Sequence, residues 1–212
     1  MLNEKHYLCT GPTKANKIII LAHGAGAPMD SPFMTAFSKG LGARGIQVVR
    51  FEFPYMQRRR AEGSARPPDR SPKLEETWRE VVANVRTTFT DSKTLVIGGK
   101  SMGGRIASLI ADSEGVDGLV CLGYPFHPPG KPQKTRTEHL FSLRTPTLIV
   151  QGMRDSLGDF DDVQGYQLSN NTELFWLEDG DHSFKPRKAS GRTEEQAWKE
   201  GIDAVGNFIE AL

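Results

Sequence analysis

The residue with the clearest chemical potential in this 212-residue chain is a serine set among glycines. Ser101 lies at the centre of Gly99-Lys-Ser-Met-Gly103, which fits the pattern G-x-S-x-G. In that pattern a serine projects from a sharp turn between a strand and a helix. Glycines are needed there because the turn is strained and flanking side chains would collide with the neighbouring elements. The spacing predicts a nucleophilic serine, provided that a strand precedes it and a helix follows it.

The same stretch also resembles the end of a phosphate-binding loop, whose motif is G-x-x-x-x-G-K-[ST]. With Gly99 as the second glycine of that motif, the first glycine would have to stand five residues earlier. Thr94 occupies this position, so the glycine-rich part of a phosphate loop is missing. The sequence favours the nucleophile over the phosphate-binding interpretation.

A serine hydroxyl needs a base to take its proton and a third group to orient that base. Of the five histidines, only His182 comes after the strand expected to carry the acid, in a loop that follows the last predicted strand. Asp155 lies closest to the end of the acid-bearing strand and is predicted to orient His182. Three other aspartates lie where the next helix is expected to start: Asp159, Asp161 and Asp162. Two more flank the histidine and are expected to shape its loop: Asp179 and Asp181.

Acyl transfer also requires hydrogen-bond donors for the oxyanion that develops on the substrate. The backbone N–H of Met102, directly after the serine, is one predicted donor. The second is expected in the turn His23-Gly-Ala-Gly26, where the N–H of Ala25 is favoured and that of Gly26 is the alternative. We expect His23 itself to brace this turn rather than to act as a second base.

These groups must be brought together by strands that end at one edge of a sheet. Six apolar runs are expected to be strands: residues 17–22, 47–53, 95–97, 118–122, 147–151 and 171–177. Apolar residues at helical spacing indicate helices between them, around residues 33–41, 78–89, 106–110 and 198–209. This alternation predicts an α/β fold with a doubly wound, mostly parallel sheet of about six to seven strands, flanked by helices. Functional groups in such sheets gather at the carboxyl ends of the strands.

Two segments carry more specific expectations. The first helix should begin with Ser31 as its N-cap and Pro32 as its first residue, and should be closed by three glycines: Gly40, Gly42 and Gly45. Residues 54–72 form the least regular part of the chain and hold five arginines: Arg58, Arg59, Arg60, Arg66 and Arg70. They are expected to form a solvated, mobile loop, or else a basic rim that attracts an anionic substrate.

Composition limits the classes of function. A length of 212 residues with 37% hydrophobic and 25% charged residues predicts a single domain over residues 1–212. The net charge of +1 gives no reason to expect nucleic acid or an anionic membrane as a partner. No apolar run is long enough to span a bilayer, and the first residues lack the apolar core of a signal peptide. Two cysteines, Cys9 and Cys121, without metal-site spacing fit a cytoplasmic protein that needs no metal or other cofactor.

Taken together, four motifs resemble the α/β-hydrolase superfamily over essentially the whole chain. They appear in the expected order: His23-Gly-Ala-Gly26, Gly99-Lys-Ser-Met-Gly103, Gln151-Gly-Met-Arg-Asp155 and Gly180-Asp-His182. In detail the chain is similar to small, lidless hydrolases near the dienelactone hydrolases, in a branch whose substrates are mostly unassigned. It has serine where dienelactone hydrolases carry a cysteine nucleophile, so their lactone specificity does not transfer.

The resemblance implies that Ser101, Asp155 and His182 are catalytic and that no cap domain is present. The pocket is expected to be open and shallow, with the loop 124–132 as one wall. The predicted function is that of a carboxylesterase-like serine hydrolase that cleaves a small acyl ester through an acyl-enzyme. The alternative is a hydrolase-fold protein-interaction module with little or no turnover, because fold alone does not determine function.

Overall fold

A computed structural model describes residues 6–212, which form a seven-stranded sheet with helices on both faces. The strands in chain order are β1 Tyr7–Thr10, β2 Lys17–Ala22, β3 Gln47–Phe51, β4 Thr94–Lys100, β5 Gly118–Leu122, β6 Thr147–Gly152 and β7 Thr172–Leu177. They lie in the order β1-β3-β2-β4-β5-β6-β7. Only β1 is antiparallel to its neighbour, and the other pairs are parallel. The predicted α/β class is confirmed.

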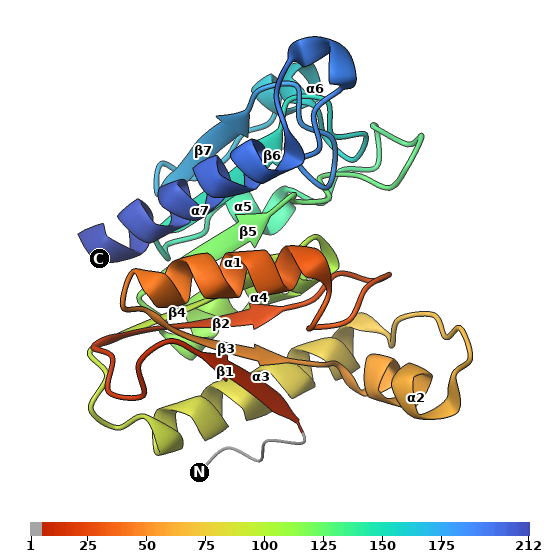
Figure 1. The fold of residues 1–212 in the computed structure, drawn as a ribbon. Helices are drawn as coiled ribbons and strands as arrows, with labels where there is room; N and C mark the ends of the chain where they lie inside the picture. Colours follow the sequence, from red (N-terminus) through yellow and green to blue (C-terminus); the bar gives the residue numbers. More distant parts are fainter. Residues whose placement is uncertain (1–5) are drawn as a thin grey trace.

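Two helices cover each face of the sheet. The helices are α1 Pro32–Ala43, α2 Pro54–Glu62, α3 Ser71–Thr88, α4 Met102–Glu114, α5 Glu138–Phe141, α6 Phe160–Gln164 and α7 Glu194–Ala211, with a 3-10 turn at Lys188–Ser190. One apolar cluster joins α1 and α7 to the sheet, and Figure 1 shows these two helices along the same side. A second cluster joins α3 and α4 to the opposite face. No helix in the described range is long and apolar enough to cross a membrane.

Burial on both faces explains why the central strands read as unbroken apolar runs. In β2, Ile18 to Ala22 are all fully buried. This strand pairs in parallel with β3 on one side and β4 on the other, with Ala22 opposite Phe51 and Gly99. The carboxyl ends of these strands consequently meet at one edge of the sheet, where the predicted functional residues follow.

The first helix begins as predicted but ends later. Ser31 is the N-cap and its hydroxyl accepts from the N–H of Met34 at 3.5 Å, with proline at the first helical position. Gly40 lies inside α1 and Gly42 is its penultimate residue, whereas Gly45 follows the helix with a φ of 81°. A Cβ on Gly40 would stand 2.7 Å from a methyl group of Ile202 on α7. The glycine is needed for the close approach of α1 to α7, which a sequence pattern could not indicate.

The structure differs from the sequence-based predictions in two further places. β1 was not predicted, because it has four residues and lies at the edge of the sheet, where no residue of the strand is fully buried. The expected loop 54–72 contains α2, and the strand before it ends at Phe51 rather than Phe53. Only Tyr55 and Met56 of α2 are buried, so this helix lacks the apolar stripe by which helices are recognised.

Candidate active site

Ser101 lies in the strained turn that its sequence predicts. It connects β4 to α4 with φ 51° and ψ −115°, a conformation that residues with side chains rarely adopt. Its N–H donates to the carbonyl of Leu122 at the end of β5, at 2.9 Å. The turn is thus fixed by the neighbouring strand, and the hydroxyl stands at the carboxyl end of the sheet.

The two glycines that flank this serine leave room for the backbone of β2. A Cβ on Gly99 would lie 2.2 Å from the carbonyl oxygen of Ala22, and Gly99 also has a positive φ of 157°. A Cβ on Gly103 would lie 2.6 Å from the carbonyl oxygens of both Ala22 and His23. The G-x-S-x-G spacing therefore reflects close contact with β2 at both positions.

The three residues of the predicted triad form a continuous chain of hydrogen bonds. The Nδ1 atom of His182 lies 2.7 Å from Asp155 Oδ2, and its Nε2 atom lies 2.9 Å from Ser101 Oγ. Because the carboxylate only accepts, Nδ1 carries the proton and Nε2 is left to accept from the serine hydroxyl. This is the tautomer that a general base for Ser101 requires.

A glutamine that the sequence analysis did not single out holds the carboxylate in place. Asp155 is fully buried. Its Oδ2 accepts from Gln151 Nε2 at 2.9 Å, and its Oδ1 accepts from the N–H of Leu157 at 2.9 Å. Gln151 is itself fixed, since its Oε1 accepts from the N–H of Tyr124 at 2.7 Å. A buried charge with these partners keeps its orientation toward His182.

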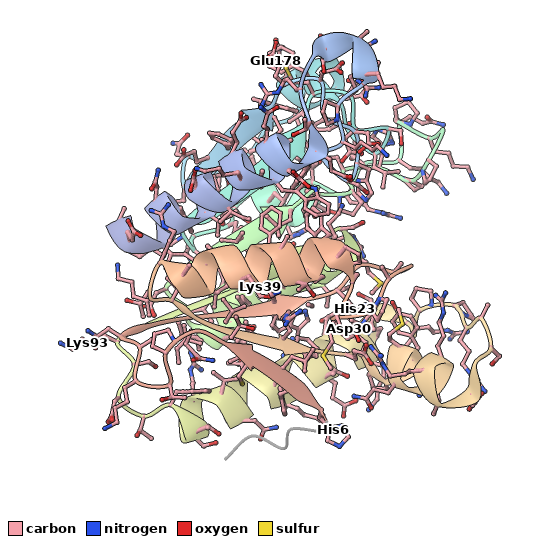
Figure 2. All side chains as sticks on the ribbon, viewed as in Figure 1. His6, His23, Asp30, Lys39, Lys93 and Glu178 are labelled. Atoms are coloured by element: carbon pink, nitrogen blue, oxygen red, sulfur yellow. The ribbon has the colours of Figure 1, made fainter. Side chains whose placement is uncertain are left out.

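The turn after β2 lies against the serine, and its carbonyl groups accept hydrogen bonds from neighbouring side chains. A Cβ on Gly24 would be 3.6 Å from that of Ser101. His23 Nε2 accepts from the N–H of Phe53 at 3.2 Å, so Nδ1 carries the proton and donates to Gly24 O at 2.7 Å. Burial lowers the pKa of His23 and keeps it neutral. His23 braces the turn, as the sequence suggested, and Figure 2 shows it at the end of the sheet that faces α2.

Helix α2 supplies the remaining braces of this turn. Tyr55 donates from its hydroxyl to the carbonyls of Gly24 and Ala25, at 3.3 and 3.1 Å. Arg59 donates to the carbonyl of Gly26 at 3.2 Å. Within residues 6–212, the N–H groups of Ala25 and Met102 donate to no protein acceptor. Two unpaired donors therefore flank the serine, from the two segments expected to supply them.

Three of the other arginines of this region pair with local acids, whereas Arg70 forms no ion pair within residues 6–212. Arg58 lies 2.6 Å from Asp69, and Arg60 forms ion pairs with Glu52 and Asp30 at 2.5 and 2.8 Å. Arg66, in the segment after α2, pairs with Glu62 at the end of that helix. The Arg60–Glu52 pair attaches α2 to the end of β3. The basic rim that the arginine content suggested would rest on Arg59 and Arg70, which pair with no acid in the described range.

An open cleft of about 630 Å³ leads to the serine. Its walls are the turn after β2, the start of α1, the loop of His182 and the start of α7, with Phe33, Met34 and Trp198 as its large apolar side chains. The expectation that the loop 124–132 forms one wall is wrong, because none of its residues lines the cleft. Tyr124 and Phe126 turn inward and are fully buried.

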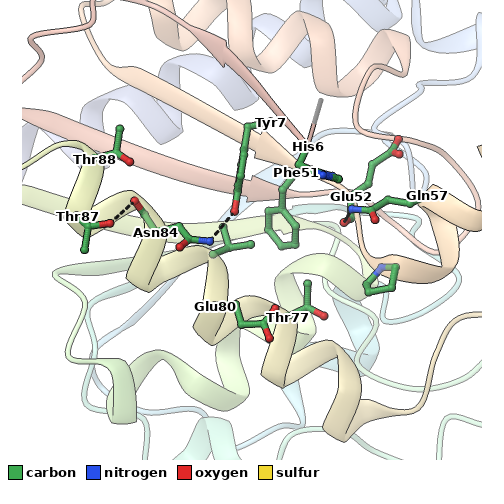
Figure 3. A pocket seen from close by; sticks show the side chains of 12 residues that line it. His6, Tyr7, Phe51, Glu52, Gln57, Thr77, Glu80, Asn84, Thr87 and Thr88 are labelled. Atoms are coloured by element: carbon green, nitrogen blue, oxygen red, sulfur yellow. Dashed lines mark hydrogen bonds between the residues drawn. The ribbon is translucent and has the colours of Figure 1, made fainter. Parts of the chain in front are cut away.

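A second pocket, of about 520 Å³, lies between the β1–β3 edge of the sheet and α3 (Figure 3). Two of its three threonine hydroxyls donate to helix carbonyls: Thr77 to Lys73 O at 2.9 Å and Thr87 to Asn84 O at 3.0 Å. Within residues 6–212 no histidine or carboxylate is hydrogen-bonded to these hydroxyls, unlike Ser101 in the cleft. Across the described residues, no group of three or more histidine, cysteine, aspartate or glutamate side chains could hold a metal ion.

Sequence reasoning missed Gln151, Tyr55 and Arg59, which position functional groups without reacting themselves. The sequence held one indication that Gln151 has a special role. It ends an otherwise apolar strand, and an amide side chain is unusual in a buried core. Tyr55 and Arg59 had none, since their contacts depend on a helix whose sequence lacks helical periodicity.

Comparison with known proteins identifies the family and the fold. A family model described as an alpha/beta hydrolase domain matches residues 15–210. The chain is similar to an α-β serine hydrolase homologue from Coxiella burnetii, with 20% identity over 98% of this chain and 94% of that one, at a TM-score of 0.73. It is similar to a lidless α/β serine hydrolase from Xanthomonas campestris (21% identity, 94% and 88% covered, TM-score 0.70). It is also similar to a dienelactone hydrolase from Anabaena variabilis (19%, 97% and 90% covered, TM-score 0.74). At these identities the likeness shows a shared fold.

Proposed function

The chain belongs to the alpha/beta hydrolase domain family, and from this premise we propose that it is a serine hydrolase that cleaves small acyl esters. The observation that carries the proposal is the unbroken hydrogen-bonded chain from Ser101 through His182 to Asp155, at 2.9 and 2.7 Å. A structural serine needs neither a strained backbone nor a histidine of defined tautomer. Both features are expected of a nucleophile with its base.

In the proposed reaction, Ser101 Oγ attacks the ester carbonyl carbon while His182 Nε2 takes the hydroxyl proton. The imidazolium that forms is stabilised by the Asp155 carboxylate at Nδ1. The carbonyl oxygen becomes an oxyanion, which in this proposal accepts hydrogen bonds from the N–H groups of Met102 and Ala25. Collapse of this intermediate expels the alcohol, which receives the proton from His182, and leaves an acyl group on Ser101. Water then attacks the acyl-enzyme with His182 as base, and the acid is released.

The cleft supports a small ester rather than a long-chain lipid or a protein substrate. Its volume of about 630 Å³ is within the range of small-molecule sites. Phe33, Met34 and Trp198 offer apolar surface to an acyl chain or aromatic ring. The segment between β5 and β6 contains only the four-residue helix α5, which leaves the cleft without a cap there.

A fluorophosphonate probe tests the proposal, because it reacts covalently only with an activated serine. We expect the wild-type protein to be labelled and the Ser101→Ala variant to remain unlabelled. A panel of p-nitrophenyl esters with different chain lengths and charges would then define the acyl preference. If folded wild-type protein is neither labelled nor active on any ester, the enzyme proposal is refuted. The hydrolase-fold interaction module would then be the better account of the chain.

A further inference from the structure

The residue before the nucleophile, Lys100, has an environment that the proposed reaction does not explain. Its Nζ donates to the main-chain carbonyl of His182 at 2.5 Å. In residues 6–212 this carbonyl accepts from no other group, and Lys100 forms no ion pair. The residue as a whole is partly exposed at the cleft, but its ammonium group is surrounded by protein. A buried lysine without a carboxylate partner is costly and requires a reason.

Two aromatic rings and a glycine form the rest of that environment. The ammonium lies over the rings of Phe33 and Phe184, at 5.5 and 5.7 Å from their centroids. Such contacts stabilise a cation while leaving its hydrogens available to the carbonyl. Gly123, at the end of β5, makes room for it, because a Cβ there would lie 2.7 Å from Lys100 Nζ and 3.0 Å from the His182 oxygen.

We propose that Lys100 is a positioning residue that holds the backbone of His182 and thereby keeps the imidazole between Ser101 and Asp155. This inference rests on the proposed function. The Asp155 carboxylate and the serine hydroxyl hold the two nitrogens of the ring, but neither contact fixes the loop from which the ring projects. The residues on either side are held by other contacts, since Trp198 Nε1 donates to the carbonyl of Ser183 at 3.1 Å and the N–H of Arg154 donates to that of Gly180 at 2.9 Å. Lys100 holds the carbonyl of His182 itself, and it comes from the strand that leads into the nucleophile.

The charge of Lys100 gives the proposal a pH signature. Burial lowers the pKa of Lys100 from 10.5 to about 8, and the charges of Asp155 and Asp181 oppose this shift. The other titratable groups near this end of the cleft are His182 itself and Glu194 at the start of α7. Loss of the proton above about pH 8 replaces a charge-assisted hydrogen bond by a weaker neutral one. Turnover in the wild type should therefore fall on the alkaline side, toward the level of a protein without the ammonium.

The test compares the wild type with Lys100→Met, which keeps a similar length and volume without charge or donor. We expect kcat on a neutral p-nitrophenyl ester to fall by about tenfold to a hundredfold, the range for a hydrogen bond from a charged group. KM should change little, because Lys100 holds the histidine rather than the substrate. The alkaline limb near pH 8 should be absent in Lys100→Met. The matched control is Lys39→Met on the exposed side of α1, labelled in Figure 2, which should behave as the wild type.

A proton NMR measurement makes the outcome independent of turnover. The His182 Nδ1 proton bonded to Asp155 should give a downfield resonance, assigned by its absence in His182→Ala. In Lys100→Met this resonance should be lost or shifted, because the ring is no longer held. If the resonance, kcat and the alkaline limb all persist in folded Lys100→Met, the positioning role is refuted. Failure of the fluorophosphonate to label the wild type would instead refute the serine-hydrolase proposal, while the NMR comparison would still decide the role of Lys100.

Discussion

Replacing Lys100 by methionine should make the protein more stable at neutral pH even though it lowers activity. The pKa of Lys100 falls from 10.5 to about 8 because burial penalises its charge. At about 1.4 kcal/mol for each pH unit, holding the charged form in the folded protein at pH 7 costs about 3 kcal/mol. Methionine removes this cost but leaves the His182 carbonyl without its donor, a loss of about 1–2 kcal/mol. The free energy of unfolding of Lys100→Met should exceed that of the wild type by about 1–2 kcal/mol at pH 7.

The difference in stability between Lys100→Met and the wild type should change with pH in a defined direction. Because the folded-state pKa lies below that of the unfolded chain, the unfolded state binds more protons between pH 8 and pH 10.5. The stability contributed by this site therefore rises with pH across that window in the wild type. Lys100→Met lacks the titration, so its advantage should shrink to about zero near pH 9.5. All other ionisable groups are common to both proteins and cancel in the difference.

Urea unfolding at pH 7 and pH 9.5, followed by tryptophan fluorescence, measures both quantities. Lys39→Met serves as the control and should show no pH-dependent difference from the wild type. Lys100→Met could instead be less stable than the wild type at pH 7, by an amount that does not change with pH. Burial of the ammonium would then not destabilise the folded protein. The assignment of a depressed pKa to Lys100 would then be wrong.

Three further predictions concern the rest of the site. Ser101→Ala and His182→Ala should each lower kcat on p-nitrophenyl esters by at least about a thousandfold. A loss below about tenfold for His182→Ala would mean that His182 is not the base. Tyr55→Phe removes the donor that holds the turn after β2 and should lower kcat by about tenfold with KM unchanged, whereas a change confined to KM would contradict this role. Gly103→Ala should lower the free energy of unfolding by about 1–3 kcal/mol in a urea titration, because the new Cβ would lie 2.6 Å from two carbonyl oxygens. Gly26→Ala serves as the control, because Gly26 has open space around it.

The sequence was sufficient to predict the elements whose residues interact with near neighbours or with a common core. The strands with buried faces, the start of α1 at Ser31 and the turn at Ser101 each follow from a local pattern. Helix α2 follows from none, because its position depends on partners that are distant in the sequence. The N–H of Tyr55 donates to the side chain of Asp69, and Arg60 pairs with Asp30. Pairings of this kind cannot be read from periodicity, which reports only burial.

The same reasoning applies within the site. The order Ser101, Asp155 and His182 could be predicted because each residue follows a recognisable strand. Lys100 could not, because it contacts His182, 82 residues further along the chain, and Gln151 had only the indication of an amide at the end of an apolar strand. The missing glycine at Thr94 excluded a phosphate loop but gave Lys100 no role, and its contact with the carbonyl of His182 appears only in the structure.

The topology explains why His182 needs a support beyond its two ring contacts. The nucleophile follows β4 and the histidine follows β7, which lie three strand spacings apart, or about 14 Å. His182 must therefore reach back over the ends of β6 and β5 to meet Ser101. Asp155, after β6, supports the ring along the way, and Lys100 crosses the end of β5 at Gly123 to hold the main chain. A glycine at the end of β5 and a lysine at the end of β4 are thus parts of one arrangement, since a side chain at position 123 would occupy the space of the ammonium.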